Sequence, residues 1–248
     1  MCATQSTEFW HTRENSMTNS DFKTLYLFAD SQLLFWKRRG RPLLEEVVEQ
    51  AGTAAPRAAY IGASNGDRPE FYEIFTAAMQ SVGVADRRRI DSAFSPDDRA
   101  FLESAHIILL AGGEVRVGWD VFERTGMKDV ILSRYAHGAV LVGISAGAVQ
   151  LGSQAVVETA RSAASELLDV FNLVRAVVDV HDERNEWRRL SSTIHLLEGA
   201  ALGLGIPAGG GVAIHSGGEI EPLRQPAHEF LFDGSRVTHS LLCPPEGE

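Results

Sequence analysis

The 248-residue sequence has few of the residues that build disulfide-stapled, nucleic-acid-binding or membrane-spanning proteins. Its two cysteines, Cys2 and Cys243, form neither a disulfide framework nor a metal-ligand spacing. Lys and Arg total 23 against 33 Asp and Glu, so the formal charge of −10 argues against a nucleic-acid partner. No apolar run approaches the roughly 18 residues typical of a membrane span. We therefore expect a cytoplasmic protein without membrane contact, metal or cofactor.

What the sequence does contain is a regular alternation of strand and helix patterns. Residues 1–20 are polar and aperiodic, which predicts a disordered or loosely attached tail before a single α/β domain at 21–248. Fully apolar strands predict a mostly parallel sheet with helices on both faces, a three-layer α/β fold with a short antiparallel C-terminal extension. The predicted strands are 24–29, 57–64, 104–113 and 173–180, with shorter ones at 211–215, 228–232 and 236–242; the predicted helices are 42–52, 69–83, 119–137 and 185–199; and 138–153 predicts a strand, a sharp turn and a helix.

Small residues follow three of these strands. The turns are GASNGD at 62–67, AGGE at 111–114 and GISAGA at 143–148. Ligands of such sheets bind at the carboxyl ends of the strands, and glycine lets the backbone approach a substrate closely. Each turn alone could be an ordinary strand-to-helix connection, but together they predict the floor of one site.

The third turn carries the sequence of a nucleophile elbow. Gly143-Ile144-Ser145-Ala146-Gly147 matches G-x-S-x-G, with an apolar strand before it and a helix of small residues after it. A serine on such a turn presents its hydroxyl above the sheet, and the helix N-terminus behind it favours a developing oxyanion. The alternative is a serine that only caps a helix.

A serine nucleophile needs a base, and His181 is the best-placed histidine. It directly follows the predicted strand 173–180, in a polar segment that runs from Asp179 to Arg184. This position puts it at a carboxyl strand end, as Ser145 is. The alternative is a solvated loop histidine.

These residues resemble the serine peptidase family of aspartyl dipeptidases and cyanophycinases. The similarity covers about residues 60–214, and its most specific parts are SAGA at 145–148 and DVH at 179–181, followed by Arg184, Arg188 and RRL at 188–190. The resemblance implies a fold like that of class I glutamine amidotransferases. It also implies a Ser-His-acid site without metal, and a small peptide or isopeptide substrate that is cleaved next to an acidic residue, usually aspartate.

Carried over to this sequence, the resemblance makes Ser145 the nucleophile and His181 the base. The backbone N–H groups of Gly113 and Ala146 would form the oxyanion hole. These assignments describe an acyl-enzyme hydrolase of the exopeptidase, dipeptidase or isopeptidase type.

Substrate contacts are expected from three charged residues. Arg184 and Arg188 follow the histidine, and a guanidinium binds a carboxylate bidentately. Glu114, which follows the paired glycines, is the third. The alternative for the two arginines is a solvated helix face with Glu183 and Glu186 as partners.

The third member of the triad is the residue that this sequence does not supply clearly. Where the dipeptidase branch carries a glutamate, in a Leu-Pro-Glu-Gly-like turn, Ala208 stands here. The cyanophycinase branch takes its acid from between serine and histidine. That segment offers Glu158 as the first choice, and then Glu166 and Asp169.

Two other functions fit parts of the sequence. A fold relative with an incomplete triad could serve binding or regulation, which Ala208 motivates. An α/β-hydrolase esterase would have the same elbow but would need His239 as its base. The aromatic and basic segment 34–40 is either a homodimer contact or a basic surface loop.

Overall fold

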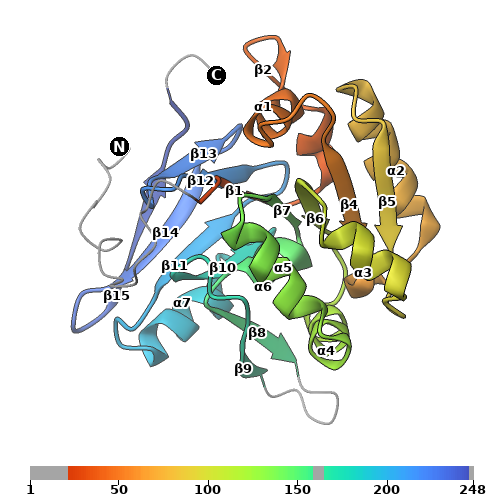
Figure 1. Cartoon of the computed structure of the whole chain (residues 1–248). Coiled ribbons are helices and arrows are strands. Elements are labelled where there is room, and N and C mark those ends of the chain that lie inside the picture. The colour runs from red at the N-terminus through yellow and green to blue at the C-terminus, as the bar shows by residue number, and fades with distance from the viewer. Residues whose placement is uncertain (1–21, 159–164, 246–248) are drawn as a thin grey trace.

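The computed structural model describes residues 22–158 and 165–245, so the expected tail at 1–20 lies outside the described residues. Its centre is a seven-stranded sheet, seen in Figure 1. In spatial order the strands are β13 (Ile220–Leu223), β12 (Gly211–Ile214), β1 (Leu25–Phe28), β7 (Val140–Ile144), β6 (Ile107–Leu110), β4 (Arg57–Ile61) and β5 (Asp86–Ile90). Five neighbouring strands run parallel, namely β1, β7, β6, β4 and β5. At the other side of β1, β12 and β13 add an antiparallel edge.

Helices cover both faces of this sheet because its strands are apolar on both faces. On β4, Tyr60 faces one helical layer and Ile61 the other, as the pleat of a strand requires. The layer on the Tyr60 face consists of α1 (Leu43–Gln50) and α2 (Pro69–Ser81), and the opposite layer of α3 (Pro96–Leu102), α4 (Val115–Thr125), α5 (Met127–Ala136) and α6 (Ala146–Leu151). The predicted three-layer α/β fold is confirmed.

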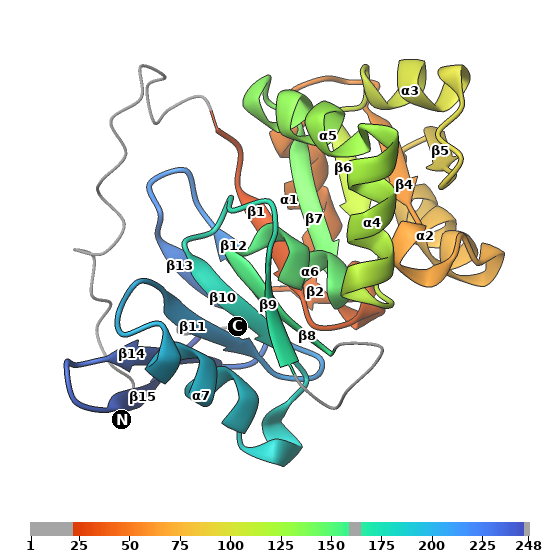
Figure 2. The same ribbon diagram turned by 90° about the horizontal axis from the view of Figure 1, so that it is seen from below.

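A second sheet of four strands packs against the same core. Its order is β10 (Ala176–Val180), β11 (Leu202–Ile206), β14 (Ala227–Phe232) and β15 (Val237–Leu242), where β10 and β11 are parallel and the others antiparallel. Val178 and Leu204 join the main core, whereas Val177 on the other face packs against α7 (Arg188–Leu196). Figure 2 shows α7 outside this sheet. The predicted strands at 173–180, 228–232 and 236–242 therefore belong to a separate sheet, not to the central one or its extension.

Two short hairpins complete the described strands. They are β2 (Lys37–Arg38) with β3 (Arg41–Pro42), and β8 (Gln154–Glu158) with β9 (Ser165–Asp169). The region predicted as one helix at 119–137 lies in α4 and α5, because Gly126 adopts a left-handed φ of 72° between them. Among the described helices, none has the length and apolarity needed to cross a membrane.

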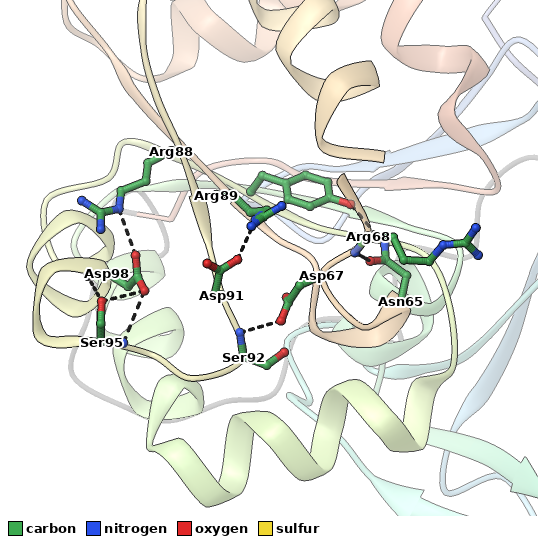
Figure 3. Close-up of polar contacts among 10 residues, drawn as sticks. Asn65, Asp67, Arg68, Arg88, Arg89, Asp91, Ser92, Ser95 and Asp98 are labelled. Atoms are coloured by element: carbon green, nitrogen blue, oxygen red, sulfur yellow. Dashed lines mark hydrogen bonds and ion pairs between the residues drawn. The ribbon is translucent and has the colours of Figure 1, made fainter. Parts of the chain in front are cut away.

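The edge strand β5 is rich in arginine and was not predicted. Two of its arginines are paired with acids: Arg88 Nε donates to Asp98 at 2.9 Å and Arg89 Nε to Asp91 at 2.6 Å, as Figure 3 shows. Charge on an edge strand hinders pairing with another sheet edge. Its charges therefore suit β5 to the edge of the sheet. Its sequence lacks the alternation of apolar and polar residues that is typical of a strand.

Candidate active site

Ser145 occupies the sharp turn between β7 and α6. Its φ of 49° and ψ of −110° are unusual for a residue with a side chain, and such strain is typical of a nucleophile elbow. The turn is fixed from two sides, because the Ser145 N–H donates to the Phe28 carbonyl at 2.9 Å and the Ser145 carbonyl accepts from Val149 N–H at 3.1 Å. The predicted strand, turn and helix are thus present, with the serine at the carboxyl end of β7.

The glycines of the elbow are needed for close packing. A Cβ atom on Gly147 would collide with the carbonyl oxygen of Leu110, the last residue of β6. Consequently α6 starts directly against the neighbouring strand. This contact keeps Ser145 close to the turn that follows β6.

His181 lies within hydrogen-bond distance of the serine. Its Nε2 is 3.0 Å from Ser145 Oγ, as a base that accepts the serine proton requires. The residue follows β10 with a left-handed φ of 44°, and its N–H donates to the Ile206 carbonyl at 2.9 Å. His181 is therefore positioned by the second sheet, and not by the sheet that carries Ser145.

The two expected oxyanion donors lie at the adjoining turns. Gly113 follows β6 with φ of 140°, and the next N–H, of Glu114, donates to the Ser64 carbonyl at 2.7 Å. Ala146 is the first residue of α6, so its N–H has no partner within the helix. Within the described ranges, neither the Gly113 nor the Ala146 N–H donates to a backbone carbonyl. Both remain available for an oxyanion.

Two cavities meet at the serine. The larger has a volume of about 620 Å³ and the smaller about 360 Å³, and both are lined by Gly113, Glu114, Ser145 and His181. Turns after β4, β6 and β7, which neighbour one another in the sheet, contribute to the larger one. A scissile bond at Ser145 would thus lie next to both cavities.

The smaller cavity is lined by an ion pair between the buried Asp179 and the exposed Arg189. Arg189 Nη2 donates to Asp179 Oδ1 at 2.7 Å, and Arg189 Nε to Oδ2 at 3.4 Å. Burial raises the pKa of the Asp179 carboxyl above its ordinary value, whereas the Arg189 guanidinium opposes that rise. Arg189 is 44% exposed, so part of its guanidinium faces the cavity.

The two arginines predicted to contact substrate lie elsewhere. Arg184 and Arg188 are exposed and line neither cavity, and Arg188 pairs with Glu186 at 3.1 Å. They occupy the solvated surface that was the alternative interpretation. Glu114, by contrast, lines both cavities.

The candidates for the third triad member are all accounted for. Glu158 is an exposed residue at the end of β8 that lines the smaller cavity, but no carboxylate of the described residues forms a hydrogen bond with His181. Glu166 forms an ion pair with Arg116, and Asp169 accepts from Gln154 at 2.9 Å. The described part of the chain therefore has a serine-histidine pair without a bonded acid.

The esterase alternative receives no support from the geometry. His239, the base of the esterase alternative, lies on β15 and shares a hydrogen bond of 2.8 Å with His228. In the described residues no group of three or more His, Cys, Asp or Glu side chains could hold a metal ion.

Comparisons with known proteins place the chain in a family. The model of Peptidase family S51 matches residues 25–221. An uncharacterized peptidase of Bacillus subtilis strain 168, YgaJ, is 24% identical over 115 residues, which are 46% of this chain and 50% of that protein. The match thus spans about half the length of the curated relative.

Solved structures share the fold. A peptidase from an acI-B1 Actinobacterium superposes with a TM-score of 0.65 at 17% identity, over 92% of this chain and 96% of that one. A putative peptidase E protein from Listeria monocytogenes EGD-e gives 0.59 at 21% identity, over 82% and 98%. The family expected from the serine and histidine motifs is the one that matches most of the sequence: the chain belongs to peptidase family S51.

Proposed function

We propose that this protein is a serine peptidase of the exopeptidase, dipeptidase or isopeptidase type. The observation that carries the proposal is the 3.0 Å contact between Ser145 Oγ and His181 Nε2, made beside two unpaired backbone donors. Membership of a peptidase family supports the same reaction class.

The reaction follows from the positions of these groups. Ser145 Oγ attacks the carbonyl carbon of the scissile bond while His181 Nε2 takes the hydroxyl proton. The N–H groups of Gly113 and Ala146 bind the resulting oxyanion. Collapse of the intermediate breaks the carbon–nitrogen bond, and His181 returns the proton to the leaving amine. Water, activated by His181, then hydrolyses the acyl-enzyme.

The proposed substrate carries a carboxylate next to the scissile bond. Arg189 supports this assignment, because it lines the smaller cavity and its position is fixed by two hydrogen bonds to Asp179. Guanidinium groups suit carboxylates through their fork of donors. We assign to Arg189 the role that the sequence suggested for Arg184 and Arg188.

Labelling with a fluorophosphonate tests the nucleophile. We expect one adduct per chain, located on Ser145 by peptide mass spectrometry and absent from Ser145→Ala. Ser31→Ala is the matched control, because Ser31 lines the larger cavity but makes no contact with His181. An unlabelled wild-type protein at high probe concentration, or an adduct on another residue, would contradict the proposal.

Replacing Ala208 by glutamate should raise kcat for acidic dipeptides by about tenfold or more. The Ile206 carbonyl that holds the His181 backbone lies two residues before this position, and a carboxylate beside the imidazole orients it and stabilises its charged form. Ala208→Gln introduces a side chain of the size of glutamate but without its charge, and it should give no such increase in kcat. Equal changes in the two variants would show that an acid at this position does not assist the histidine.

A further inference from the structure

The larger cavity differs from the smaller one in the chemistry of its walls. Large apolar side chains line it, among them Leu34, Tyr60, Phe71, Ile74, Phe75 and Val117. Its volume of about 620 Å³ lies within the range of pockets that enclose small ligands. Because it also reaches Ser145 and His181, whatever occupies it lies next to the reacting bond.

Two large hydrophobic side chains that are exposed in the described part of the chain belong to this lining. Phe71 of α2 is 40% exposed and Val117 of α4 is 47% exposed, whereas Phe75 beneath them is 1% exposed. These helices cover opposite faces of the central sheet and both reach the carboxyl ends of its strands, as Figure 2 shows. Exposed apolar side chains that converge on a cavity mark a binding surface.

Two charged groups of this cavity, Asp30 and Arg68, have partners within the protein, and a third, Glu114, lies where the two cavities meet. Asp30 accepts from the N–H of Gln32 at 2.9 Å and of Gly209 at 2.7 Å. Arg68 Nε donates to Glu70 at 2.7 Å. The large side chains that line this cavity are mostly apolar, and this lining favours an uncharged occupant.

The floor of this cavity is held in place by polar contacts among its own residues and with the segment after β5. Asn65 Nδ2 donates to the Tyr60 hydroxyl and to the Gly112 carbonyl, both at 3.1 Å, and Asp67 accepts from Ser92 N–H at 2.8 Å. Figure 3 shows this turn and its link to the segment after β5. With its hydroxyl engaged by Asn65, Tyr60 offers its ring to the cavity. The pocket is therefore pre-formed for an apolar group.

We propose that the larger cavity binds a bulky apolar or aromatic side chain on one side of the scissile bond, opposite the carboxylate side at Arg189. This inference rests on the proposed peptidase activity. It assigns the substrate class: a short peptide that joins a large hydrophobic residue to an acidic one. Phe71 and Val117 become residues that determine specificity.

Two fluorophosphonates of different size test the assignment, one with an ethyl and one with a 4-phenylbutyl chain. The rate constant for labelling Ser145 should be at least about tenfold higher for the phenylbutyl compound, the discrimination expected of a hydrophobic pocket. The ratio should fall to below about three in Phe71→Ala and in Val117→Ser. Leu196→Ala, which removes a 76% exposed side chain outside both cavities, is the control and should keep the wild-type ratio.

The outcomes separate the two proposals. Equal rates for the two compounds in the wild type, or a ratio unchanged in both cavity variants, would overturn the apolar subsite while Ser145 remains the nucleophile. Absence of labelling by either compound would instead refute the peptidase proposal, and with it this inference. Faster hydrolysis of Asp-Phe than of Asp-Ala, or of Phe-Asp than of Ala-Asp, would support the apolar subsite with a natural peptide bond.

Discussion

Replacing His181 by glutamine is expected to lower kcat/KM for peptide hydrolysis by roughly four to six orders of magnitude. The imidazole Nε2 that accepts the Ser145 proton at 3.0 Å is lost, and an amide group cannot serve as a base at neutral pH. The rate is measured with an acidic dipeptide, and fluorophosphonate labelling of Ser145 should slow in parallel. Because the His181 side chain is exposed, the variant should retain its fold.

His195→Gln is the matched control for this change. His195 is an exposed histidine of α7 whose ring contacts Phe232 and lines neither cavity. It should keep wild-type turnover and a similar unfolding temperature. If His181→Gln retained more than about one hundredth of the activity, another group would be acting as the base and the proposed mechanism would be wrong.

Gly113→Ala is expected to reduce kcat by about two to three orders of magnitude, with a smaller change in KM. A Cβ atom at this position would collide with the Ser64 carbonyl oxygen, and the φ of 140° is unfavourable for alanine. The turn must shift, and the Gly113 N–H then no longer points at the oxyanion. Loss of one such donor costs about this much in other hydrolases.

Gly83→Ala controls for the conformational strain alone. Gly83 has φ of 79° at the end of α2, and a Cβ atom there would meet nothing within 4 Å. Both variants should lose stability in thermal unfolding, but only Gly113→Ala should lose kcat. Comparable kcat values in the two variants would remove Gly113 from the oxyanion hole.

Much of the local structure could be predicted from the sequence, because short-range patterns encode it. The G-x-S-x-G elbow at Ser145 and the position of His181 after a strand are both present in the structure. The sheet that each strand joins is not encoded this way. An apolar run such as 173–180 has the same pattern in either sheet, so the placement of β10 beside β11 depends on tertiary packing.

Arg189 shows a second limit of sequence reasoning. The predicted helix at 185–199 begins at Arg188 in the structure, and its second residue, Arg189, is the one that pairs with the buried Asp179. In the sequence, Asp179 stands out only as the first residue of the DVH motif at 179–181. In the structure it is buried, and a buried carboxylate needs a cationic partner. Searching the next helix for that partner could have identified Arg189.

Ser145 and His181, the proposed catalytic pair, are supplied by two different sheets. Ser145 is built by the central sheet and His181 by the four-stranded one, each held by its own backbone contacts. Neither half contains a working nucleophile. The proposed peptidase activity therefore requires both sheets to be folded and docked, and a chain in which only one of them has formed should be inactive.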